Sequence, residues 1–241
     1  MLGGLILAAG RGRRMGDLTD DKPKTLLMHR GETLFNRIID NFVKCQIQDI
    51  AIVRGYRKEL LIDNRISDYF ENTRWATTNI LRSLLAADEF LSAHDTIVSY
   101  ADIFYDQDAV KQLIEAKDDL ALTSNMNFLT SWQARFEDIF SDIESFIVNE
   151  QEYLIEIGQR VSSLDSVQGQ YMGLFKITSK AWQNIREFLT VFSEEQLDAM
   201  DMTSFFNLLL ENNIKIKTVP YHGAWGEMDT AEDYALYSEA C

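Results

Sequence analysis

The chain has 241 residues, of which 46% are hydrophobic, and its formal net charge is −15 at pH 7. This length and apolar content predict a folded unit with a full core. Because a strongly acidic surface repels polyanions, nucleic acid is not an expected partner. The apolar runs stay well short of the ~20 residues that span a bilayer. The two cysteines form no CxxC pair. We therefore expect a cytoplasmic protein without a membrane segment, a disulfide framework or a zinc site.

Strand and helix patterns alternate along the first half of the chain. Short apolar runs predict strands at 4–9, 49–53, 96–100 and 120–123. Apolar residues at helical spacing predict helices at 33–45, 58–66, 79–91 and 108–116. This alternation predicts an α/β fold, in which a Rossmann-like, mostly parallel sheet carries helices on both faces in three layers. The strands would then end at one edge of the sheet, where their loops meet.

The second half of the chain has a different pattern. Strands joined by polar turns are predicted at 143–148, 153–157 and 169–177. Helices at 179–192 and 203–210, a strand at 214–219 and a last helix at 230–239 follow. Thr230 is suited to cap that last helix. No linker or repeat divides the chain, so we expect a single domain over 1–241 with a mixed sheet and a small β-rich subregion.

A basic, glycine-rich loop follows the first predicted strand. Glycines let backbone N–H groups approach an anion closely. Arg11, Arg13 and Arg14 supply positive charge against the acidic balance of the whole chain. Lys22-Pro23-Lys24 comes next, and the proline stiffens the chain beside Lys24. The loop predicts a phosphate site, with a solvated surface loop as the alternative.

Two other phosphate-binding motifs fit this loop less well. Gly10-x-Gly12 begins the dinucleotide fingerprint, but Met15 occupies the third glycine position. The second predicted strand ends in Arg54 and not in an acid, so a dinucleotide site would be one for NADP. A Walker A loop is not indicated, because no Gly-Lys-Ser/Thr follows the glycines. An NADP-binding oxidoreductase therefore stays as an alternative.

Two acidic positions far apart in the sequence are candidates for holding a divalent ion. Transfer of a phosphoryl or nucleotidyl group concentrates negative charge, and Mg²⁺ takes one or two carboxylates as ligands. Asp102 follows the predicted strand at 96–100, and Asp229 precedes the last helix. Each also has an ordinary explanation, because aspartate is common in turns and at helix starts.

The string Leu-Ala-Ala-Gly-x-Gly-x-Arg-Met at 7–15, followed by Lys-Pro-Lys at 22–24, resembles the opening of the nucleotidyltransferase superfamily of nucleoside-diphospho-sugar pyrophosphorylases. The resemblance implies that the glycine loop wraps a nucleotide, that Arg14 contacts its phosphates and that Lys24 assists at the reacting phosphates. It implies metal ligation by Asp102 and by the Glu-x-Asp element formed by Glu227 and Asp229.

Within that superfamily the chain is most similar to the bacterial choline-phosphate and aminoethylphosphonate-type cytidylyltransferases, through its strings at 72–84, 100–104, 169–173 and 227–234. The resemblance implies a nucleotide-binding half at 1–125 and an acceptor-binding half at 126–241 that holds the second metal carboxylate. The nucleotide-binding residues that we expect are Leu7, Ala8, Ala9, Gly10, Arg11, Gly12, Asn79, Ser83, Tyr100 and Ala101.

The expected activity is that of a Mg²⁺-dependent cytidylyltransferase, which moves CMP from CTP to a small phosphorylated or phosphonate acceptor and releases pyrophosphate. Choline phosphate, aminoethylphosphonate and phosphorylated amino-acid derivatives are the acceptors that the resemblance implies, as precursors of cell-surface polysaccharide or lipid. A nucleotidyltransferase for a sugar 1-phosphate with UTP, dTTP or GTP is the main alternative, and a non-catalytic nucleotide-binding protein is a further one. A homo-oligomer is compatible with the sequence.

Fewer residues of the sequence indicate how the acceptor would be bound. Four aromatic residues, Phe128, Trp132, Phe136 and Tyr171, are suited to frame a quaternary ammonium, although core packing is the preferred interpretation. Three acidic residues are suited to attract an amine, although a solvated surface is preferred for them: Asp138, Asp142 and Glu144.

Overall fold

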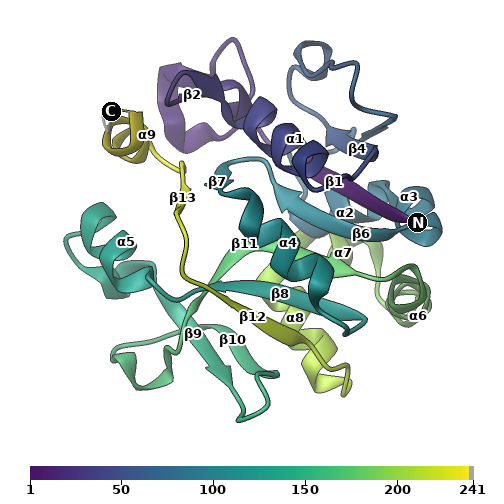
Figure 1. Ribbon diagram of the computed structural model, residues 1–241, viewed down its shortest axis with the longest axis vertical. Helices are drawn as coiled ribbons and strands as arrows, with labels where there is room; N and C mark the ends of the chain where they lie inside the picture. Colours follow the sequence, from purple (N-terminus) through teal and green to yellow (C-terminus); the bar gives the residue numbers. More distant parts are fainter. Residues whose placement is uncertain (239–241) are drawn as a thin grey trace.

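The computed structural model describes residues 1–238, and a seven-stranded sheet runs through its centre (Figure 1). In spatial order the strands are β12 (Lys217–Tyr221), β8 (Leu120–Asn125), β11 (Gln170–Ile177), β6 (Asp95–Tyr100), β1 (Leu2–Ala8), β4 (Asp49–Arg54) and β5 (Asp68–Glu71). Strand β11 runs antiparallel to both of its neighbours, and the other pairings are parallel. The predicted mostly parallel, mixed sheet is confirmed.

Helices cover both faces of the sheet. Successive side chains of a strand point to opposite faces, so each strand contributes to an apolar core on either side. Leu5 and Leu7 of β1 pack in one apolar core and Ile6 and Ala8 in the other. The first core includes residues of α2 (Ile80–Ala86), α3 (Asp88–Ala93), α6 (Ser179–Leu189), α7 (Glu194–Ala199) and α8 (Met202–Glu211). The second includes residues of α1 (Leu34–Lys44), α4 (Gln107–Glu115) and α5 (Phe128–Arg135). The three-layer arrangement is therefore confirmed.

Three small antiparallel pairs complete the fold. Strands β9 (Glu144–Val148) and β10 (Leu154–Arg160) form the expected β-rich subregion, and β2 (Met28–His29) pairs with β3 (Glu32–Thr33). Strand β7 (Ile103–Tyr105) pairs with β13 (Trp225–Glu227), which leads into α9 (Ala231–Ser238). Within residues 1–238, every helix is too short or too polar to traverse a bilayer.

Glycine is required at one position of β11. The pairing of β11 with β8 is interrupted by a bulge between Tyr171 and Phe175, and Gly173 lies inside it with φ +75°. A Cβ atom at Gly173 would lie 2.9 Å from the ring of Tyr100. The glycine therefore permits both the left-handed backbone and the close approach of that ring.

Some predicted boundaries were wrong. The helix predicted at 58–66 is a single 3-10 turn at Lys58–Leu60, because Arg57 is left-handed and the Asp63 carboxylate accepts a hydrogen bond from the Arg65 N–H in a local turn. The helix predicted at 79–91 is divided at Ala87. Strand β12 begins three residues later than expected, and residue 239 of the last predicted helix lies outside the described residues. The sequence patterns missed β2, β3, β5, β7, β13, α5 and α7.

Candidate active site

A cavity of about 550 Å³ lies where β1 and β6 end. Parallel strands in such sheets leave a crevice at their carboxyl ends, which is the usual place for a ligand. The predicted site residues that line the cavity are Leu7, Ala8, Ala9, Gly10, Gly12, Arg14, Lys24, Asn79, Ser83, Tyr100, Ala101, Asp102, Glu227 and Asp229. The structure thus brings both ends of the chain to one site.

Arg11 has a different position from the rest of its loop. Within residues 1–238, Arg11 is not one of the residues that line the cavity. Its guanidinium pairs with Asp20 and lies 5.6 Å from the ring centroid of Tyr56. A direct contact between Arg11 and a nucleotide therefore stays a prediction.

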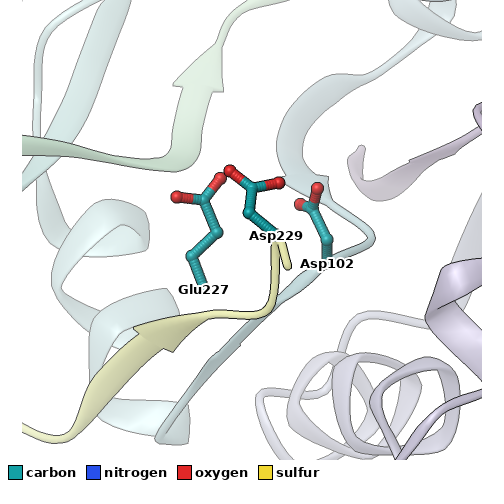
Figure 2. A group of neighbouring side chains, drawn as sticks. All are labelled: Asp102, Glu227 and Asp229. Carbon is teal, nitrogen blue, oxygen red and sulfur yellow. The ribbon is translucent and has the colours of Figure 1, made fainter. Parts of the chain in front are cut away.

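Three carboxyl groups meet at one side of the cavity. The side chains of Asp102, Glu227 and Asp229 turn toward one another (Figure 2), and one oxygen of each lies within 4.8 Å of the others. The pairing of β7 with β13 causes this convergence, because it sets Glu227 opposite Ile103. The Met228 N–H also donates a hydrogen bond to the Asp102 C=O at 2.9 Å. These contacts join two segments that are more than a hundred residues apart in the sequence.

Two cations of the N-terminal loop neutralise part of this acidic cluster. Lys24 Nζ lies 2.6 Å from Asp102 Oδ2 and 2.8 Å from Asp229 Oδ1, and Arg14 Nη2 lies 3.0 Å from Asp229 Oδ2. Gly12 is left-handed, and a Cβ atom there would lie 2.9 Å from the Cβ of Lys24. The loop glycine is therefore needed for the lysine stem to pack beneath the loop.

The pKa values of the cluster follow from burial and from these pairs. Burial disfavours the charged form of Lys24, but the charges of Asp102 and Asp229 outweigh burial and raise its pKa. Burial also disfavours ionisation of Asp229, yet Lys24 and Arg14 lower the pKa of that carboxyl. Burial, followed by the charges of Asp229 and Asp102, raises the pKa of Glu227 well above its usual range. Additional positive charge would favour the ionised form of Glu227.

The acidic cluster fits a divalent cation. Its donors are three carboxylates, the hard oxygen ligands that Mg²⁺ prefers. Asp102 Oδ1 is buried and has no hydrogen-bond partner within residues 1–238. A buried acceptor without a partner is unfavourable, and a bound cation would satisfy it. Asp102, Glu227 and Asp229 are therefore the residues that would hold the ion.

The loop before α2 forms another wall of the cavity. Asn79 caps α2 by accepting a hydrogen bond from the Ile80 N–H at 2.8 Å. Asn72 is buried and donates to the hydroxyl of Ser83 at 3.1 Å, so it fixes a side chain that faces the cavity. Trp75 also lines the cavity. Asn72 and Trp75 belong to the string at 72–84, but the sequence alone indicates no role for either of them.

The prediction of a solvated surface for Asp138, Asp142 and Glu144 was only partly correct. Asp142 and Glu144 line an adjoining cavity of about 220 Å³, which shares Glu227 and Asp229 with the larger one. Burial, followed by the charges of Asp201 and Asp142, raises the pKa of Glu144 to about 6. Asp138 is exposed and caps a 3-10 turn at Ile139–Ser141, as a surface residue would.

The aromatic residues have two different roles. Phe128 belongs to the core, as preferred. Trp132 is 5% exposed and stacks on Trp225 with ring centroids 5.7 Å apart. It also lines the smaller cavity together with Tyr171, and its indole N–H donates to Asp142 at 3.0 Å. Core packing therefore explains only part of this cluster.

Sequence reasoning missed one charged residue beside the carboxylates, Arg135 of α5. Its guanidinium lies 2.8 Å from Asp233, 3.5 Å from Glu227 and 4.0 Å from Asp229. A single arginine in a weakly amphipathic helix carries no signal of its own in a sequence.

The fold and the paired cation–carboxylate cluster define a nucleotidyltransferase of the α/β class. The chain belongs to the MobA-like NTP transferase family, whose model matches residues 4–134. A CTP:phosphoglutamine cytidylyltransferase from Campylobacter jejuni is 31% identical over 98% of both chains. A 2-aminoethylphosphonate cytidylyltransferase from Lancefieldella rimae is 30% identical over 45% of this chain and 46% of that one. The predicted family resemblance is confirmed, and the alternative of an NADP-binding oxidoreductase is wrong.

Solved structures show the same fold. An inositol-1-phosphate CTP transferase from T. maritima has a TM-score of 0.77 and 20% identity, over 98% of this chain and 95% of that one. A CTP:phosphocholine cytidylyltransferase from Streptococcus pneumoniae has a TM-score of 0.71 and 18% identity, over 99% of this chain and 98% of that one.

Proposed function

We propose that this chain is a cytidylyltransferase that transfers CMP from CTP to a small acceptor carrying both a phosphate or phosphonate group and an amine. The observation that carries the proposal is the convergence of Lys24 and Arg14 with Asp102, Glu227 and Asp229 at one cavity. Cations and a metal-binding acid cluster at one point suit a reaction between two anionic groups. The names of the relatives from C. jejuni and L. rimae support CTP and this acceptor class.

The chemistry needs positioning more than proton transfer. An oxygen of the acceptor's phosphate or phosphonate attacks the α-phosphorus of CTP, the bond to the β-phosphate breaks, and pyrophosphate leaves. That oxygen is already ionised at neutral pH, so no general base is required. Bound Mg²⁺ would supply counter-charge to the phosphates. Lys24 and Arg14 supply further positive charge from the loop, and holding the two anions together provides much of the rate.

The amine of the proposed acceptor fits the smaller cavity. The carboxylates of Asp142 and Glu144 face it, and within residues 1–238 neither forms an ion pair. The rings of Trp132 and Tyr171 line the same space, and aromatic rings attract a nearby cation. A buried acid with a raised pKa gains most from a ligand that brings positive charge.

A pyrophosphate-release screen tests the proposal. The chain is incubated with Mg²⁺ and each of CTP, UTP, GTP and dTTP, against choline phosphate, aminoethylphosphonate, phosphoglutamine and hexose 1-phosphates. We expect release with CTP and an amine-bearing acceptor, and none from a matched Asp102→Asn variant. Release restricted to hexose 1-phosphates with UTP, dTTP or GTP would establish the sugar nucleotidyltransferase alternative. CTP binding without release under any condition would establish a non-catalytic protein.

A further inference from the structure

The turn that carries Asp229 is held by one buried acid of the next helix. Asp233 Oδ2 accepts hydrogen bonds from the N–H groups of Asp229 at 2.9 Å and Thr230 at 3.0 Å. The Asp233 N–H in turn donates to the Thr230 hydroxyl at 3.2 Å, so the predicted cap of this helix is confirmed. Asp233 is 3% exposed. The backbone position of Asp229 therefore depends on where the Asp233 carboxylate is fixed.

Arg135 fixes that carboxylate. Its Nε and Nη2 donate to the two oxygens of Asp233 at 2.8 and 3.2 Å, which is a two-point contact with a planar fork. Its Nη1 donates to Glu227 Oε2 at 3.5 Å. The Arg135 guanidinium thus reaches the acidic cluster directly, at Glu227 and at 4.0 Å from Asp229, and also through Asp233 at the turn of Asp229.

The surroundings of Arg135 make this contact rigid. The side chain is 1% exposed, and its guanidinium carbon lies 5.0 Å from the ring centroid of Phe136 and 5.6 Å from that of Trp132. Removal of either partner of a buried ion pair leaves an uncompensated charge away from water, which is strongly destabilising. Lysine lacks the planar fork, so it cannot reproduce the two-point contact.

We propose that Arg135 is a positioning residue that orients Glu227 and Asp229 for a divalent ion and so sets the affinity of the site for that ion. This rests on the proposed function only in assigning a metal to the three carboxylates. It gives α5, which follows the nucleotide-binding half, a role in the metal site and not in the core alone. Partners that orient metal ligands typically change metal affinity by about 10- to 100-fold when they are replaced.

The test measures metal binding without catalysis. Binding of Mn²⁺ to the nucleotide-free chain is titrated by electron paramagnetic resonance of the free ion, at a temperature where circular dichroism shows each variant folded. The variants are Arg135→Lys and, at the other end of the same contact, Asp233→Asn. The matched control is Arg54→Lys, because Arg54 is 14% exposed, pairs with Glu71 and lies 4.3 Å from the ring centroid of Tyr69, outside the cavity lining.

We expect at least tenfold weaker Mn²⁺ binding for both site variants and a change below twofold for the control. In turnover, the apparent KM for the metal should rise by a similar factor in the Arg135→Lys variant, while the KM for the acceptor changes less than twofold. A merely structural role would not separate these two constants.

Mn²⁺ binding within twofold of the unchanged chain would overturn the inference, even if CMP transfer is observed. An unchanged chain that binds no Mn²⁺ would also overturn it. Weakened binding supports it even where no acceptor is turned over.

Discussion

Replacement of Glu144 by glutamine tests the acidic side of the cavity, because it removes a charge and keeps the shape. Burial and the neighbouring acids raise the pKa of this carboxyl from 4.5 to about 6. At about 1.36 kcal/mol per pKa unit, ionised Glu144 destabilises the folded chain by ~2 kcal/mol. The backbone N–H and C=O of Glu144 bond to Gln170 at 3.3 and 2.6 Å, and these contacts do not use the substituted side chain.

The gain in stability should depend on pH in a defined direction. Below pH 4.5 the carboxyl is protonated in both folded and unfolded chains, so the Glu144→Gln variant and the unchanged chain should be equally stable. The difference should grow between pH 4.5 and 6 and reach ~2 kcal/mol above pH 6. For a chain of this size, that is a rise in Tm of about 4–8 °C. Urea unfolding of the nucleotide-free chain at pH 4 and pH 8 measures both ends.

The same substitution should weaken the acceptor site, because a stabilising change in a binding cavity commonly lowers activity. We expect the KM for an amine-bearing acceptor to rise about tenfold or more. The control is Glu150→Gln, in the exposed turn of the same hairpin, where surface substitutions change stability by about 0.5 kcal/mol or less. The reasoning would be refuted by a variant that is less stable than the unchanged chain at pH 8, or by an equal gain at pH 4 and pH 8.

Three further substitutions test the other side of the cavity. Lys24→Ala should lower kcat by about 10²–10³-fold, as expected when one transition-state donor is lost, and a change below twofold in a pyrophosphate assay would reject its role. Asp102→Asn should abolish turnover and leave the circular dichroism spectrum unchanged; near-normal turnover in Mg²⁺ would exclude Asp102 as a ligand. Gly12→Ala should destabilise the chain by about 1–2 kcal/mol through its left-handed backbone and also lower kcat by displacing Lys24, so normal kinetics would argue against that contact.

The sheet and the basic, glycine-rich loop could be predicted from the sequence because both have strong local signals. The first strand is a short run of apolar residues because both of its faces pack in a core, and Gly10, Gly12 and Lys24 lie in a string specific enough to indicate the family. The convergence of Asp102 with Asp229 had no such local signal. It depends on two three-residue strands, β7 and β13, which are too short to show any periodicity. The residues alone left Asp102 and Asp229 as candidates with ordinary alternatives, and the family resemblance decided in favour of that pair.

The proposed acceptor side was harder to predict, because tertiary contacts decide the chemistry of its side chains. Glu144 and Asp142 are ordinary surface residues by type, and their burial comes from the packing of the β9–β10 hairpin beside the cavity. Arg135 is one of many arginines in the sequence, and what distinguishes it is its 1% exposed side chain and its contacts with three acids. The helix predicted at 58–66 was wrong because a turn at Asp63 competes with helix formation.

The bulge in β11 divides that strand into two parts with different freedom to change. Because β11 runs against its neighbours, its first residues lie at the cavity, where Tyr171, Met172 and Gly173 are part of the lining. After the bulge, Leu174 to Ile177 pair with β6 and hold the sheet together. A substitution at Tyr171 can therefore reshape the pocket while the strand register after Gly173 stays intact.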